Sequence, residues 1–258
     1  MGRFCHRIAL MTTTTLKRVL RYVSHFGLSA GLQAARLHVR PQSVVRIKLP
    51  GIEHPIWARA GTSDVETFEE VFVARQYDLP FADFKPRHIL DLGANVGYAS
   101  VYFAARWPLA RILAIEPSGK NLAFLERNTR AWNCITPLQA AVWSHSTVVR
   151  IANPGDEANA YRMSEAAAAQ PEGIPAYTVD ELIARLGCER LDLLKMDVEG
   201  AESEIFKNRT GWLDRINVMM IELHDRIVPE CARVLYDALR GRRFRQEIVG
   251  GNLAIDFR

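Results

Sequence analysis

The stretch "ILDLGANVGYAS" (residues 89–100) opens with apolar residues, passes through two glycines and continues with residues that suit a helix. This order predicts a buried strand, a tight turn and a helix. Turns of this kind at the carboxyl end of a parallel strand commonly hold a cofactor. The question that the stretch raises is which ligand the turn accepts.

Three classes of ligand can be compared at this turn. A P-loop needs GxxxxGK[ST], but Gly93 is followed by "ANVGYAS", which has no lysine. A dinucleotide site needs GxGxxG, but position 95 is Asn. Asp91, at the strand end, would repel a pyrophosphate and attract a cation. S-adenosylmethionine carries an ammonium, a sulfonium and a carboxylate but no phosphate, so it fits best.

The second predicted strand supports this interpretation. It ends at Glu116, where an acid can accept hydrogen bonds from both ribose hydroxyls. NAD sites use such an acid too. Glu116 therefore distinguishes S-adenosylmethionine from NAD only when it is taken together with Asp91, Gly93 and Gly97. The helix N-terminus after Gly97 suits a carboxylate. The alternative is that Asp91 caps the turn and Glu116 is a solvated strand end.

From residue 88 onward, continuous apolar strands alternate with amphipathic helices. This alternation predicts an α/β fold of Rossmann-like type, a mostly parallel sheet covered on both faces, closed by an antiparallel pair around Gly250 and Gly251. Residues 153–173 are expected to form a surface insertion. Three segments follow: a basic amphipathic helical segment (1–40), a segment that covers the cofactor and shapes the acceptor pocket (41–86), and the cofactor-binding domain (87–258). Ser63 or Asp64 is the expected N-cap of a helix in the second segment.

Charge and cysteine content narrow the functional classes. Residues 1–50 carry nine Lys or Arg and no acid, whereas the other 208 residues carry 24 basic and 29 acidic residues. Nucleic-acid binding by the main domain is therefore disfavoured. No apolar run approaches 18 residues, and the four cysteines form no ligand motif, so we expect a cytoplasmic protein. The basic N-terminal helix would suit peripheral contact with the inner face of a membrane, although packing on the protein's own core is the commoner role.

Five motifs resemble those of the FkbM-type methyltransferases, in order and spacing: "DLGANVGYAS", "AIEPSGKNLAFLERN", "YTVDEL", "LLKMDVEGAE" and "IELH". The resemblance covers roughly residues 57–224. It implies a seven-stranded methyltransferase fold, S-adenosylmethionine as cofactor, and methylation of hydroxyls on sugars or polyketide-like natural products. It also implies the cofactor-binding residues, which are Asp91, Gly93, Ala94, Asn95, Gly97, Glu116, Pro117, Ser118, Ala141, Val142 and Asp197.

Methyl transfer to an alcohol requires removal of a proton from a poor nucleophile. Candidate groups should lie where the fourth and fifth strands end, and the sequence places Asp197, Glu199, Glu222 and His224 there. One interpretation makes His224 a general base oriented by a carboxylate. Another makes these groups ligands of a divalent metal, which the spacing does not favour because it lacks a tight ligand motif. A third treats Glu199 and Glu202 as helix caps and His224 as a structural residue.

The sequence thus predicts an S-adenosylmethionine-dependent O-methyltransferase that acts on a hydroxyl of a saccharide or related natural product. Its partner is a small-molecule or glycan acceptor and not a nucleic acid. The alternatives are a metal-assisted O-methyltransferase of another small molecule and a non-catalytic methyltransferase-like binding module.

Overall fold

The computed structural model describes residues 13–39, 42–81, 83–153, 163–165, 173–207 and 210–258. The chain divides into two compact units, residues 1–73 and 74–258. Most of the predicted insertion at 153–173 lies outside the described residues.

The first unit contains a helical hairpin and a two-stranded antiparallel sheet. Its elements are α2 (Thr13–Phe26), α3 (Leu28–Val39), β1 (Val44–Ile47), β2 (Ile56–Arg59), α4 (Asp64–Phe68) and a π-helical turn (Glu69–Val73). Gly27, with a φ of 79°, separates the two helices. In the described part of the chain, no helix is long and apolar enough to cross a membrane.

The helix α4 starts where the sequence predicts, and its N-cap is Ser63, one of the two expected residues, but that side chain does not cap the helix. Ser63 occupies the N-cap position with helical dihedrals and makes no capping hydrogen bond through its side chain. Asp64 is fully buried and accepts hydrogen bonds from the guanidinium and backbone N–H of Arg59 instead. The charge of Arg59 attracts the carboxylate more strongly than a helix N-terminus does.

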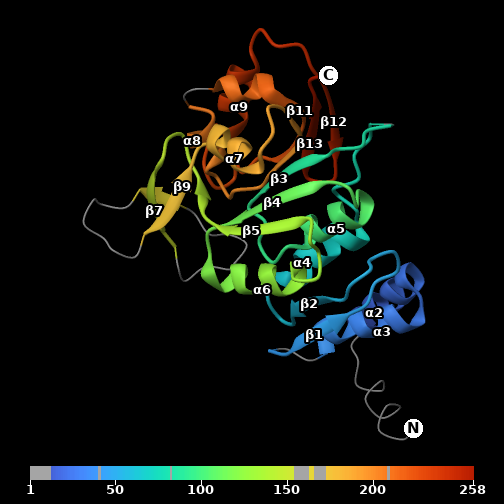
Figure 1. The fold of residues 1–258 in the computed structure, drawn as a ribbon. Coiled ribbons are helices and arrows are strands. Elements are labelled where there is room, and N and C mark those ends of the chain that lie inside the picture. The colour runs from blue at the N-terminus through green and yellow to red at the C-terminus, as the bar shows by residue number, and fades with distance from the viewer. Residues whose placement is uncertain (1–12, 40–41, 82, 154–162, 166–172, 208–209) are drawn as a thin grey trace, which may run out of the picture. The chain divides into compact units, whose positions relative to one another are not determined.

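The second unit is an α/β domain with a seven-stranded sheet and a smaller four-stranded one (Figure 1). Its strands are β3 (His88–Leu92), β4 (Arg111–Glu116), β5 (Ile135–Gln139), β6 (Ala141–Val142), β7 (Thr147–Ile151), β8 (Met163–Glu165), β9 (Ile174–Tyr177), β10 (Leu191–Met196), β11 (Ile216–Glu222), β12 (Arg245–Val249) and β13 (Asn252–Asp256). Its helices are α5 (Tyr98–Arg106), α6 (Gly119–Thr129), α7 (Val179–Leu186), α8 (Glu202–Ile205), a 3-10 turn (Thr210–Arg215) and α9 (Cys231–Leu239).

The large sheet has the strand order β12-β13-β11-β10-β3-β4-β5. Pairs from β11 through β5 are parallel, and the hairpin β12–β13 joins β11 in antiparallel fashion. This confirms the predicted Rossmann-like class, with seven strands and an antiparallel C-terminal strand. Helices α7 and α9 cover one face of the sheet, and α5 and α6 cover the other (Figure 1).

Sequence patterns explain why these strands are central. The interior residues of β3, β10 and β11 are buried on both faces because helices cover both sides. Helix α7 is fixed by a capping box, in which Thr178 and Glu181 each satisfy a backbone N–H of the other. As a result, the carboxyl ends of β3, β4, β10 and β11 meet at one edge, where parallel α/β sheets bind their ligands.

The four-stranded sheet β6-β9-β7-β8 was not predicted as a unit. Its labelled strands β7 and β9 lie to the left of β5 in Figure 1, near α7 and α8. Its first strand is only two residues long, and it pairs with a strand more than thirty residues away in sequence. Such a short strand leaves no periodic signal.

Candidate active site

The turn after β3 is held in backbone conformations that favour glycine. The φ angles of Gly93, Asn95 and Gly97 are 74°, 50° and 87°. A Cβ on Gly93 would lie 1.8 Å from the carbonyl oxygen of Asp197, so this position has no room for a side chain. The turn therefore touches the end of β10 directly, and the chain needs glycine at this contact.

Asp91, the strand-end acid that was expected to attract a cation, is fully buried beneath this glycine turn. One carboxylate oxygen accepts a hydrogen bond of 2.6 Å from the Ser100 hydroxyl, and the other lies 3.2 Å from the ammonium of Lys195. The two strands place Asp91 and Lys195 directly opposite one another. The cation that Asp91 attracts in the described structure is thus the chain's own lysine.

Lys195 links the cofactor turn to the end of β10. Its ammonium donates hydrogen bonds to the carbonyl oxygens of Gly93 (2.7 Å) and Leu92 (3.3 Å), and it lies 3.6 Å from a carboxylate oxygen of Asp197. Burial alone would lower the pKa of Lys195, but Asp91 and the other anionic neighbours raise it above its ordinary value. Lys195 is therefore a permanent positive charge beneath the turn.

Glu116, at the end of β4, braces the same turn from its other side. Its carboxylate accepts hydrogen bonds from the backbone N–H groups of Asn95 (2.8 Å) and Ser118 (2.9 Å). Burial raises the pKa of Glu116 to about 7, although these hydrogen bonds oppose the shift. The Asn121 side chain also donates to Glu116, and because an ionised carboxylate offers about four acceptor positions, a ribose hydroxyl could still be accepted. The residues here fit the predicted cofactor.

The remaining predicted cofactor residues lie around these two turns. Ala94 is buried, and its N–H donates to the carbonyl of Ile115. Ser118 caps α6, and the carbonyl of Pro117 accepts a hydrogen bond from the Gln139 side chain. Ala141 and Val142 form the buried strand β6.

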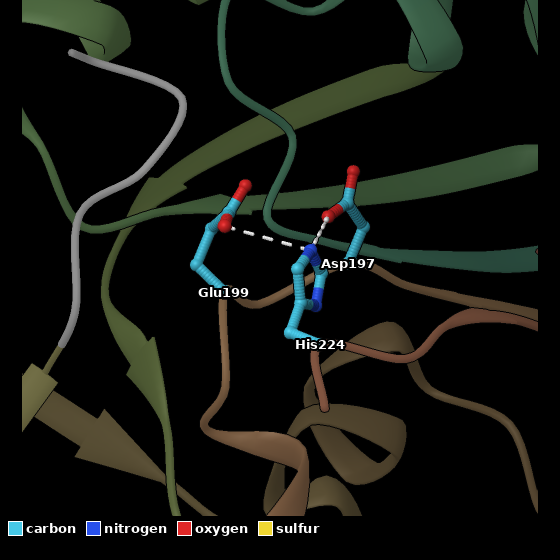
Figure 2. Close-up of side chains that lie close together, drawn as sticks. All are labelled: Asp197, Glu199 and His224. Carbon is cyan, nitrogen blue, oxygen red and sulfur yellow. Dashed lines mark ion pairs between the residues drawn. The ribbon is translucent and has the colours of Figure 1, made fainter. Parts of the chain in front are cut away.

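A cluster of acids and a histidine lies at the ends of β10 and β11, as Figure 2 shows. The imidazole Nε2 of His224 lies 3.6 Å from Asp197 Oδ1 and 3.5 Å from Glu199 Oε2. Glu222 Oε1 is 3.9 Å from the same nitrogen. All four residues predicted to act on the acceptor are thus neighbours, because β10 and β11 are adjacent parallel strands. The structure brings them together, whereas their roles stay a prediction.

Glu202 is a member of this cluster that the sequence interpretation assigned to helix capping. Its carboxylate is fully buried and lies 2.8 Å from Nδ1 of His224, and the same oxygen accepts the N–H of Val198. Glu202 therefore orients the imidazole as well as bracing the loop before α8. The sequence offers one signal for this pairing. The motif "DVEGAE" ends in an acid, and a histidine follows the next predicted strand.

Crowding of like charges changes the acidity of these groups. Burial, followed by the nearby Asp197, raises the pKa of Glu199 to about 7. Burial also raises the pKa of Glu222. Burial would lower the pKa of His224, but the hydrogen bond and charge of Glu202 raise it to about 9. The cluster thus holds exchangeable protons near neutral pH, which is typical of sites that transfer protons.

Comparisons with known proteins agree with this geometry. Residues 91–245 match the family described as Methyltransferase FkbM domain. The chain is similar to Methyltransferase sdnD of Sordaria araneosa, with 31% identity over 175 residues, which is 54% of this chain and 66% of that protein. It is also similar to the hexuronic acid methyltransferase AglP of Haloferax volcanii, with 26% identity over 141 residues, 54% of this chain and 57% of the relative.

Among solved structures, the chain is similar to the methyltransferase FkbM from Methylobacillus flagellatus KT. The TM-score is 0.47 with 14% identity, over 94% of this chain and 59% of that one. The matches thus span two thirds or less of these relatives' lengths. Because the family match alone covers more than half of the chain, the protein belongs to the FkbM methyltransferase family, and residues 91–245 lie in its methyltransferase domain.

Proposed function

We propose that the protein transfers the methyl group of S-adenosylmethionine to a hydroxyl of a saccharide or a related natural product. The observation that carries the proposal is the convergence of Asp197, Glu199 and His224 beside the cofactor turn. Lys195 joins the two regions, since it contacts both the turn and Asp197. Donor and acceptor would therefore meet at one edge of the sheet.

Each group has a defined task in this proposal. The turn at residues 93–97 and the carboxylate of Glu116 hold the cofactor, which supplies an activated methyl group when bound. The acid–histidine cluster orients the acceptor hydroxyl and takes up its proton, since an alcohol is a poor nucleophile at neutral pH. Lys195 fixes the position of the turn relative to the cluster, because it contacts both.

A saccharide acceptor is supported by the similarity to a hexuronic acid methyltransferase. A hydroxyl acceptor also suits a cluster rich in carboxylates, which accept hydrogen bonds from hydroxyl donors. We further propose peripheral membrane contact through the N-terminal region. Helix α2 exposes Leu16 and Leu20 beside the basic residues Lys17, Arg18 and Arg21.

Two measurements test the proposal. Titration calorimetry should show that the protein binds S-adenosylmethionine in preference to NAD. Release of S-adenosylhomocysteine should then be followed with uronic-acid glycosides, other glycosides and RNA as acceptors. We expect turnover only with hydroxylated small molecules or glycans.

The variant His224→Ala should lower turnover about 10²–10⁴-fold while cofactor affinity stays within a fewfold of wild type. The exposed His145 provides the matched control, His145→Ala, because its imidazole pairs with Glu165 and not with a member of the cluster. Equal turnover in the two variants would refute the assigned cluster. Absence of turnover with every acceptor, despite cofactor binding, would instead favour a non-catalytic binding module.

A further inference from the structure

The acid–histidine cluster also has the composition of a metal centre. One donor atom each from Asp197, Glu199 and His224 lies within 4.8 Å of the other two (Figure 2). We propose that these three residues bind a divalent transition-metal ion such as Mn²⁺, which activates the acceptor hydroxyl. Two carboxylate oxygens and one imidazole nitrogen suit Mn²⁺ and Zn²⁺. The inference rests on the proposed function and deepens it.

The separations between donor atoms favour a shared ion over direct hydrogen bonds. His224 Nε2 lies 3.6 Å from Asp197 Oδ1 and 3.5 Å from Glu199 Oε2. Hydrogen bonds from N–H to oxygen are about 2.7–3.2 Å long. Two neighbouring ligands, each about 2.1 Å from one ion, lie roughly 3.0 Å apart in octahedral coordination and roughly 3.4 Å apart in tetrahedral coordination. The observed spacing is closest to the tetrahedral value.

An unsatisfied carboxylate oxygen beside this space provides a second observation. Glu199 Oε2 is inaccessible to solvent and has no hydrogen-bond partner within the described residues. The His224 side chain is 1% exposed, and Figure 2 shows its Nε2 directed toward Asp197 and Glu199. Buried polar atoms without a partner cost free energy. A cation between them would satisfy the carboxylate oxygen and would displace the proton from the ring nitrogen that it binds.

The other side of the imidazole is prepared for such a role. The fully buried carboxylate of Glu202 lies 2.8 Å from Nδ1 of His224. Histidines that bind metals nearly always donate their second ring N–H to a carboxylate or carbonyl, which leaves the first nitrogen free to coordinate. Glu202 is therefore a positioning residue that aims Nε2 at the ion.

The solvent side of the cluster leaves room for the acceptor. The side chains of Asp197 and Glu199 are 24% and 19% exposed, whereas His224 closes the site from behind. With three protein ligands, open coordination positions remain for water or a hydroxyl. An alcohol bound to the cation is more acidic than a free one, so its proton leaves at neutral pH. Glu222, 3.9 Å from His224 Nε2, lies close enough to receive it.

Binding of Mn²⁺ to the purified chain, stripped with a chelator, tests this inference through electron paramagnetic resonance and calorimetry. We expect one site in the wild type. Asp197→Asn and Glu199→Gln should each weaken Mn²⁺ binding at least tenfold, and Glu202→Gln should weaken it about 10–100-fold. Glu247→Gln removes an exposed carboxylate on β12 and should leave binding unchanged. Circular dichroism confirms folding, and any one folded variant of Asp197 or Glu199 is decisive.

Absence of Mn²⁺ binding by the wild type, or equal binding by the Asp197, Glu199 and Glu247 variants, would overturn the inference. Cofactor binding and methylation measured on the same samples separate it from the proposed function. Full methylation in the presence of a chelator would refute the proposed metal centre and leave the methyltransferase proposal intact. A wild type that binds Mn²⁺ but not S-adenosylmethionine would refute the proposed function and leave the metal site standing.

Discussion

Replacing Gly93 by alanine tests the contact between the cofactor turn and the end of β10. The new Cβ would lie 1.8 Å from the carbonyl oxygen of Asp197 and 2.9 Å from its carbonyl carbon. The backbone φ of Gly93 is also positive, at 74°. The substitution therefore combines a strained dihedral with a steric clash against backbone, which cannot rotate away as a side chain can.

The matched control is Gly241→Ala, which carries the strain without the clash. Gly241 has a φ of 80°, and a Cβ there would meet nothing within 4 Å. A left-handed alanine costs about 1–2 kcal/mol, and an overpacked buried contact costs about 1–3 kcal/mol more. Gly93→Ala should therefore lose about 2–5 kcal/mol of unfolding free energy, against about 1–2 kcal/mol for the control.

Calorimetric melting can measure the difference. For a domain of this size, 1 kcal/mol corresponds to about 2–4 °C in the midpoint, so Gly93→Ala should melt roughly 2–12 °C below Gly241→Ala. Titration with S-adenosylmethionine should show weaker binding in Gly93→Ala alone, since the turn must move to relieve the clash. If the two variants melt together and bind the cofactor equally, the close contact between turn and strand does not exist in solution.

Three further predictions concern residues around the site. Asp91→Asn leaves the buried ammonium of Lys195 without its nearest carboxylate and should cost about 3–5 kcal/mol in urea unfolding, whereas a cost below 1 kcal/mol would disprove the pairing. Because the pKa of Glu116 is about 7 when folded and near 4.5 when unfolded, native Glu116 holds its proton longer, and its stabilising effect is complete below pH 4.5 and lost as pH rises through 7. Urea unfolding at pH 5 and pH 8 should therefore show a loss of up to about 3 kcal/mol that shrinks in Glu116→Gln, and an unchanged difference would contradict the assignment. Thr178→Ala removes half of the α7 capping box and should cost about 0.5–2 kcal/mol by thermal melting, with no change in cofactor affinity.

Sequence patterns were sufficient for the central strands of the sheet because those strands are apolar and are bounded by glycine, proline or acids. The residues "HILDLG" gave β3 and its turn, and the pair around Gly250 and Gly251 gave the closing hairpin. The strand ends then determined which acids could meet. Proximity of Asp197 to His224 follows from two adjacent parallel strands, so it could be predicted without coordinates.

Pairings that depend on register could not be predicted in this way. Asp91 and Lys195 are opposite each other in neighbouring strands, but 103 other residues separate them in the chain, and the charge argument for a bound cation did not include an internal lysine. Glu202 is the opposite case. Its position in the first turn of a helix is typical of a residue that satisfies backbone N–H groups. Its second partner, His224, follows β11, so this contact depends on the tertiary fold.

The segment from Lys195, near the end of β10, to Glu202, at the start of α8, has several roles within eight positions. It anchors the glycine turn, contributes carboxylates to the cluster and steers the imidazole. Under the proposed function, a change in any of these residues would disturb the handling of donor and acceptor together, so this segment would tolerate few substitutions. Diversification of acceptor preference would have to arise elsewhere, and the small sheet that contains β7 and β9 carries none of these duties.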